Sequence, residues 1–194
     1  LDSYKILLQI LGYGERLLTH PSKRLRVQIL IVMRLIFPLL STQHNLLIRE
    51  VASTWDSIIQ CVLCSDYSIV QPACSCVEQM IKYSGDFVAK RFIELWQKLC
   101  QDSFILKELR IDPTVHNHEK KSISKHVKFP PVTENALVSM VHMVLEGVKI
   151  TEYLISEAVL EQIIYCCIQV VPVEKISAMS LVVGDIVWKI RNIN

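Results

Sequence analysis

Apolar residues recur at steps of three and four along nearly the whole chain, and this period limits the possible folds more than any other feature. The clearest stripe consists of Leu47, Val51, Trp55, Ile58 and Val62. Similar stripes follow in the next two segments. A β-strand would instead show strict alternation of apolar and polar residues. The sequence therefore predicts an all-α protein in which consecutive amphipathic helices pack against one another.

About eight helices are expected from this period and from the residues that start and stop helices. The predicted ranges are 3–18, 21–37, 45–64, 67–83, 86–101, 133–149, 152–171 and 173–191. Pro21 fits the first turn of its helix, Asp66 is an expected N-cap, and Gly85 marks a stop followed by a restart. Pro38 is expected to end the helix before it, because its ring clashes with the preceding turn.

A weak internal repeat indicates how these helices stack. The segments that open two of them, around Leu25 and Val70, lie 45 residues apart. HEAT repeats recur at about 40 to 47 residues as helix pairs that bury their apolar faces only by stacking on neighbours. We therefore predict an α-solenoid of HEAT-like antiparallel helix pairs. It has repeats over residues 1–101, one long inserted loop over 102–132, and carboxy-terminal helices of the same solenoid over 133–194.

The inserted loop carries the basic balance of the chain and, lacking a sustained period, is expected to be flexible. Residues 103–132 hold six Lys or Arg and three Asp or Glu, a charge of +3, whereas the whole chain of 194 residues carries +2, so the remainder is −1. A net charge this close to zero does not indicate a nucleic-acid or membrane partner. The most apolar stretch, 29–40, is also shorter than the roughly 20 residues that a membrane span needs.

The cysteines and histidines are weak candidates for a metal site. The seven cysteines are an odd number and lie mostly in apolar runs, which favours a reduced intracellular chain. Cys61 and Cys64 form a CxxC, but Cys74 and Cys76 lie about 200° apart around their own helix, so a shared zinc ion is disfavoured. All four are interpreted as small buried hydrophobes, as are Cys166 and Cys167. His116 and His118 lie in the polar loop without a partner.

Motifs for catalysis or nucleotide binding are equally weak. The only GxG, at Gly12 and Gly14, lies inside a helical pattern and follows no strand. No ordered set of nucleophile, base and orienting residue stands out. The sequence therefore predicts no cofactor, no metal and no enzymatic activity.

A few Arg, Lys and Trp residues are candidates for a partner interface. Trp55, Trp96 and Trp188 lie on or beside apolar stripes, and core packing is the default expectation for all three. Trp188, near Arg191, is the best alternative as an interface anchor, because Trp and Arg are enriched at the energetic centres of protein contacts. A ridge for an acidic partner is a second hypothesis, formed by Arg24, Arg26, Lys90 and Arg91.

Several stretches, taken in order, resemble a known family. They are HPSKRLRVQIL at residues 20–30, the segment 46–63 with its central Trp55, and SGDFVAKRF at residues 84–92 followed by Leu95 and Trp96. The end of the chain, from PVEKI at 172–176 through Trp188, is similar in a looser way. Together they resemble the carboxy-terminal HEAT repeats of the Tti-one family, the scaffold subunits of the Triple-T complex. The resemblance covers residues 15–101 well and 133–192 loosely.

The resemblance implies a non-enzymatic co-chaperone scaffold of the cytoplasm and nucleus. It implies Tti-two and Tel-two as direct partners. Indirect partners would be phosphatidylinositol-3-kinase-related kinases of the TOR, ATM and ATR types and the ninety-kilodalton heat-shock chaperone. Two alternatives stay open from the sequence: another HEAT adaptor, such as a transport or phosphatase scaffold, and a nucleic-acid-binding module that uses the basic loop.

Overall fold

The described part of the chain forms a stack of helices. The computed structural model describes residues 2–103, 107, 130–151, 155–170 and 184. Within these residues all secondary structure is helical, which confirms the predicted class. The helices are α1 (Asp2–Leu17), α2 (Lys23–Leu39), α3 (His44–Leu63), α4 (Tyr67–Tyr83), α5 (Gly85–Asp102), α7 (Pro131–Ile150) and α8 (Glu157–Val170).

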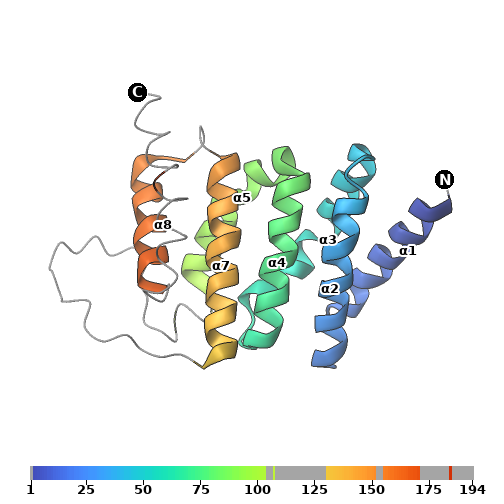
Figure 1. Ribbon diagram of the computed structural model, residues 1–194, viewed down its shortest axis with the longest axis horizontal. Helices are drawn as coiled ribbons and strands as arrows, with labels where there is room; N and C mark the ends of the chain where they lie inside the picture. Colours follow the sequence, from blue (N-terminus) through green and yellow to red (C-terminus); the bar gives the residue numbers. More distant parts are fainter. Residues whose placement is uncertain (1, 104–106, 108–129, 152–154, 171–183, 185–194) are drawn as a thin grey trace, which may run out of the picture.

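The helices form two layers that run along the molecule (Figure 1). One layer consists of α2, α4 and α7, where α4 packs between the other two, and the other layer contains α1, α3 and α5. Consecutive helices pair across the layers, α1 with α2 and α3 with α4, while α5 pairs with α7. The last of these described helices, α8, packs on α7. This is the expected architecture of an α-solenoid.

The helix pair recurs with a nearly constant period. Helices α2 and α4 begin at residues 23 and 67, which lie 44 residues apart, and α3 and α5 begin at residues 44 and 85, which lie 41 residues apart. HEAT repeats have about 40 to 47 residues, whereas tetratricopeptide repeats have about 34. The spacing of the pairs is therefore HEAT-like.

Local capping explains most of the helix boundaries. Asp66 caps α4 as predicted, because its carboxylate accepts hydrogen bonds from the backbone N–H of Ser68 at 3.1 Å and from its hydroxyl at 2.7 Å. The break predicted at Gly85 lies one residue earlier, at Ser84, which ends α4 and precedes α5. Apart from residue 184, the helix predicted over 173–191 lies outside the described residues. So does the loop predicted over 102–132, except for residues 102, 103, 107 and 130–132, of which 102 belongs to α5 and 131–132 to α7.

Two expectations about proline are wrong. Pro21 does not lie in the first turn of α2, because Ser22 is the N-cap and the helix begins at Lys23. Pro38 does not end the helix before it, since α2 continues to Leu39. Pro38 lies in the last turn, where its ring removes a single backbone hydrogen bond. The turn persists because Phe37 and Leu40 are buried and because the N–H of Leu40 donates to the carbonyls of Ile36 and Phe37.

The core is continuous through the stack and contains the predicted aromatic and sulfur-containing residues. Trp55 and Trp96 are each only 4% exposed, which confirms the default expectation for both. All seven cysteines are free thiols, and five of them are buried: Cys61, Cys74, Cys76, Cys166 and Cys167. Burial raises the pKa of Cys166 to about 12 and also raises the pKa values of Cys74, Cys76 and Cys167. These thiols therefore behave as the small hydrophobes that the sequence predicts.

Candidate interaction surfaces

The basic start of α2 is tied to the rest of the stack. Lys23 Nζ forms an ion pair of 2.9 Å with Asp66, the N-cap of α4. Arg26 is half-buried, and its Nη2 donates to the sulfur of Cys61 in α3 at 3.4 Å. Only Arg24 is exposed in this group without a contact of this kind. Arg26 therefore links two helices of the stack, whereas Arg24 is exposed to a partner.

Asp66 connects the start of α2 to the start of α4, because it pairs with Lys23 and caps α4. Partial burial acts to raise the pKa of its carboxyl, but hydrogen bonds from Ser68 and Lys23 outweigh burial and hold the pKa below the usual value. A carboxyl with a lowered folded-state pKa adds stability above its unfolded pKa of about 3.9, and this stability is lost as the pH falls through the folded-state pKa.

We expect Asp66→Ala to lower the free energy of unfolding by about 1 kcal/mol at pH 7, the usual cost of a lost N-cap. The difference from the unmodified chain should shrink as the pH falls below about 4, because the protonated carboxyl no longer attracts its partners. Urea denaturation at several pH values measures both effects. Asp56→Ala, at an exposed position inside α3, is the control. A pH-independent difference between the Asp66 variant and the unmodified chain would contradict the assigned role.

An aromatic and arginine cluster lies where α3 meets α5. The rings of Trp55 and Phe87 pack edge to face with centroids 6.1 Å apart. The guanidinium of Arg91 lies over the Phe87 ring, 4.7 Å from its centroid. Phe87 and Arg91 are half-exposed, and Lys90 beside them is exposed. A buried Trp thus supports a Phe that holds an Arg in a defined position near the surface.

The structure separates the charged residues that were predicted to form one ridge. Arg24 and Arg26 lie on α2, in the layer with α4 and α7, whereas Lys90 and Arg91 lie on α5 in the other layer. They are therefore two separate positions on the solenoid, and a partner role for each stays a prediction. Trp188 and Arg191 lie outside the described residues.

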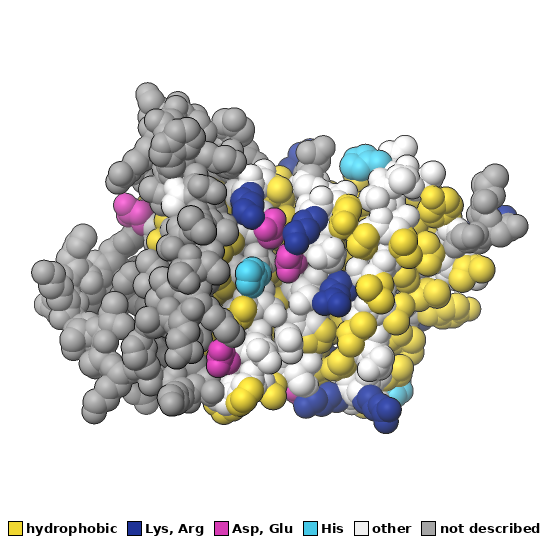
Figure 2. Space-filling model, viewed as in Figure 1, with side chains coloured by type: hydrophobic (Ala, Val, Ile, Leu, Met, Phe, Trp, Pro, Cys, Tyr) yellow, Lys and Arg dark blue, Asp and Glu magenta, His cyan; other side chains and the backbone are white. Residues whose placement is uncertain are grey.

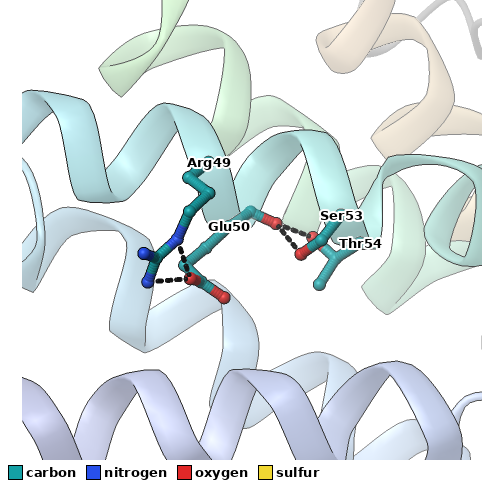
Figure 3. A network of polar contacts seen from close by, with 4 residues as sticks. All are labelled: Arg49, Glu50, Ser53 and Thr54. Atoms are coloured by element: carbon teal, nitrogen blue, oxygen red, sulfur yellow. Dashed lines mark hydrogen bonds and ion pairs between the residues drawn. The ribbon is translucent and has the colours of Figure 1, made fainter.

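A buried carboxylate lies on α3, close to the start of that helix. Glu50 is 9% exposed, and one of its carboxylate oxygens accepts hydrogen bonds from Nε and Nη2 of Arg49 at 3.0 and 2.9 Å (Figure 3). Its backbone carbonyl accepts from the hydroxyls of Ser53 and Thr54 at 3.0 and 2.8 Å. A buried charge is costly unless paired, so Arg49 compensates Glu50, and this cluster is structural.

The exposed face of α4 and α7 is polar. Lys82 lies 2.6 Å from Glu78 on α4, and Lys149 lies 2.6 Å from Glu146 on α7. The hydrogen bond to Glu78 is the main reason that the pKa of Lys82 is raised, and the charge of Glu146 adds to it. Figure 2 shows opposite charges side by side over these helices. Exposed ion pairs of this kind add little stability, so we interpret the polar face of α4 and α7 as a solvated surface.

The α1–α2 end of the stack is instead apolar. Tyr13 and Ile6 on α1 are 65% and 57% exposed, and Leu39 and Leu35 on α2 are 58% and 57% exposed. Figure 2 shows hydrophobic side chains gathered over this end. We call it the α1–α2 face and define it by Ile6, Ile10, Tyr13, Leu17, Leu35 and Leu39. Sequence reasoning missed this face, although steps of four, three and four already place the four α1 residues on one stripe.

The described residues hold no cluster for metal chemistry and no helix that could cross a membrane. No group of three or more His, Cys, Asp or Glu among them is arranged to hold a metal ion. No described helix combines the length and apolar character of a membrane span. A cavity of about 10 Å³ between α5, α7 and α8 has space for at most a single water molecule. That cavity does not fit a small-molecule substrate.

Comparison with known proteins decides the family. A family described as the TTI1 C-terminal TPR domain matches residues 2–165. The chain belongs to this family. A curated relative from Saccharomyces cerevisiae, named TEL2-interacting protein 1, is 99% identical over 193 residues, which cover 100% of this chain but 19% of the relative. The chain thus spans about a fifth of the length of that relative. No solved structure matches the chain.

The match confirms the resemblance to the Tti-one family and extends it. It begins at residue 2, so α1 belongs to the TTI1 domain as well, although the resemblance read from the sequence covers the chain well only from residue 15. The family description uses the TPR name, whereas the helix pairs here repeat after 44 and 41 residues, a HEAT-like spacing. The TTI1 domain described here is thus a two-layered solenoid with long repeats.

Proposed function

We propose that this chain is a non-enzymatic, protein-binding segment of a TTI1-type scaffold that binds Tel-two and Tti-two. The observation that carries the proposal is the near identity to a protein whose name states that it interacts with TEL2, the Tel-two subunit. The two-layered solenoid supports it, because stacked helix pairs provide long surfaces for other large proteins. Such a surface acts through shape and charge and needs no catalytic residue.

The cluster of Arg91, Phe87 and Trp55 is the strongest candidate for an anchor. Arg and aromatic side chains contribute most to protein interfaces when they are held rigidly and can be desolvated. Arg91 lies 4.7 Å from the centroid of the Phe87 ring, and Trp55 packs on the edge of that ring. Binding then costs less side-chain entropy than it would for a free arginine. Lys90, exposed next to Arg91, favours an acidic segment in the partner.

We propose the wider role that the resemblance to the Tti-one family implies. As part of the Triple-T complex, in the cytoplasm and nucleus, the scaffold would support the maturation of phosphatidylinositol-3-kinase-related kinases together with the ninety-kilodalton heat-shock chaperone. The chain would contribute a docking surface rather than contact with these kinases. Its partners in this proposal are proteins, without a nucleic acid or a membrane.

Purified Tel-two and Tti-two test the proposal directly. Each is mixed separately with the 194-residue chain, and the mass of any complex is measured on a sizing column with light scattering. A stable one-to-one complex that persists at about 0.5 M salt supports binding through a largely apolar interface. A chain that stays helical by circular dichroism but binds neither subunit would overturn the proposal.

A substitution at Arg91 tests the anchor. We expect Arg91→Ala to weaken binding of the preferred subunit by about 10- to 30-fold, the loss typical of an interface hot spot. Arg34→Ala is the matched control, because Arg34 is an exposed arginine on α2 in the other layer. Calorimetric titration measures both affinities. Equal affinities for the two variants would exclude Arg91 as an anchor without affecting the broader proposal.

A further inference from the structure

Exposed apolar surface is concentrated at one end of the solenoid. Among the described residues, six large hydrophobic side chains are exposed, and four of them lie on α1 and α2: Ile6, Tyr13, Leu35 and Leu39. The other two, Tyr83 and Val132, are isolated on separate helices. Single exposed hydrophobic residues need no explanation, but a contiguous group marks a contact surface.

Helix α1 has two apolar stripes rather than one. Its buried stripe consists of Leu7, Leu11 and Gly14, of which Leu7 is half-buried, and Leu18 in the turn after the helix continues it; this stripe packs toward the rest of the stack. Its outer stripe consists of Ile6, Ile10, Tyr13 and Leu17, which are exposed or half-buried. At 3.6 residues per turn the two stripes lie roughly 100° apart. A helix at the surface of a stack needs only the first stripe. Within the second stripe Ile10 also packs against the core, but Ile6 and Tyr13 are 57% and 65% exposed.

Helix α2 shows the same feature in the other layer. Its buried stripe includes Leu30, Met33 and Phe37, whereas Leu35 and Leu39 lie roughly 170° away, on the opposite side of the helix. The next helix of that layer, α4, packs against α2, and its exposed positions are the polar Gln71 and Lys82 and a single large hydrophobic residue in its last turn, Tyr83. Both layers therefore present an apolar stripe at the α1–α2 end, as a helix pair in the middle of a solenoid does.

Solenoids that end in solvent close with a repeat whose outer face is polar. The α1–α2 face does not meet this condition, so the pair has the character of an internal repeat. The chain corresponds to 19% of its relative, and its family describes a C-terminal domain, so most of the relative is sequence outside this segment. We propose that the helix pair directly preceding this segment in the longer TTI1 protein stacks on the α1–α2 face.

The stacking would repeat the contacts seen inside the segment. One helix of the preceding pair would pack on α2 as α2 packs on α4, and the other would pack on α1 as α1 packs on α3. The repeat spacing of 44 and 41 residues, from α2 to α4 and from α3 to α5, would place this pair within roughly one repeat length before α1 in the longer protein. The α1–α2 face is then an internal contact of the scaffold and leaves other surfaces for partners.

Hydrogen exchange tests this assignment in three samples: the 194-residue chain, the full-length yeast relative, and the full-length relative with Tel-two. We expect peptides from Asp2–Leu17 and Lys23–Leu39 to exchange at least about tenfold more slowly in the full-length protein than in the chain alone. Added Tel-two should leave these two helices unchanged. Equal exchange in the first two samples, or slowing only with Tel-two, would overturn the assignment.

A matched pair of substitutions separates stacking from a general effect of chain length. Leu35→Glu in the full-length protein should abolish the slowing in α1 and α2, because it places a charge in the contact. Gln71→Glu adds the same charge at an exposed position of α4 and should leave the slowing intact. In the 194-residue chain both variants should have the same denaturation midpoint as the unsubstituted chain. Slowing that survives Leu35→Glu, or protection in the chain alone that rises with its concentration, would refute stacking.

These outcomes are independent of the proposed function. Tel-two and Tti-two can bind the segment whether or not the α1–α2 face is covered by the preceding pair. Loss of Tel-two binding with intact slowing of exchange would reject the docking proposal alone, and the reverse result would reject the stacking proposal alone.

Discussion

Gly147→Ala is expected to lower the free energy of unfolding by about 3 kcal/mol, a large effect for the addition of one methyl group. A Cβ atom at Gly147 would lie 1.9, 2.3 and 2.7 Å from three atoms of the Phe92 ring. Phe92 is fully buried in α5, so its ring has no free space to move into. The backbones of α5 and α7 must therefore separate, which outweighs the roughly 1 kcal/mol that alanine gains over glycine in a helix.

Urea denaturation followed by circular dichroism measures this effect. Gly12→Ala is the control, because nothing lies within 4 Å of a Cβ atom at Gly12 in α1, and it should stabilise the chain slightly. Adding Phe92→Leu to Gly147→Ala should cost less than the sum of the single effects, since the smaller side chain relieves the overlap. A stability of Gly147→Ala within about 0.5 kcal/mol of the unmodified chain would contradict the close packing of α5 and α7.

Phe37→Ala is expected to cost about 4 kcal/mol, because it removes a fully buried aromatic side chain and leaves a cavity. Phe37 is 0% exposed and lies in the last turn of α2, next to Pro38. Pro38 removes a backbone hydrogen bond from this turn, so buried side chains supply much of its stability. Loss of Phe37 should therefore also fray the end of α2.

The matched control is Leu39→Ala, two residues further along the same turn. Leu39 is 58% exposed, and in this chain its truncation should change stability by no more than about 0.5 kcal/mol. Chemical denaturation gives the stabilities, and hydrogen exchange of peptides ending at Leu39 reports the fraying. Similar losses for the two variants would mean that the end of α2 does not depend on burial of Phe37.

Helix positions were largely predictable, because they depend on local patterns. The predicted range 67–83 matches α4, and the ranges for α1, α2, α3, α5 and α7 are within two residues of the observed ends. Helix α8 begins at Glu157, five residues later than predicted. Pro38 was the clearest error, because the rule that proline stops a helix considers the backbone alone and omits the burial of Phe37 and Leu40.

The candidate surfaces were less predictable, because they depend on which helices lie side by side. Arg91 was singled out from sequence, but its position over Phe87, which packs on Trp55, results from the contact between α3 and α5. A partner role for Arg26 stays a prediction, but its hydrogen bond to the sulfur of Cys61 on a neighbouring helix was not predictable from the sequence. In each case the residue type indicated an arginine able to donate hydrogen bonds or pack on a ring. Which residue it contacts depends on the packing of distant helices.

By itself the sequence determined that this protein is an all-α solenoid with HEAT-like spacing and a core rich in free cysteines, because helical period and repeat length are local properties of a chain. Only the tertiary structure decided which apolar stripes are covered. The stripes of α4 are buried between two neighbours, whereas Tyr13 and Leu35 at the α1–α2 end remain exposed. Burial depends on the neighbours that a helix meets, and the period of its own residues does not specify them.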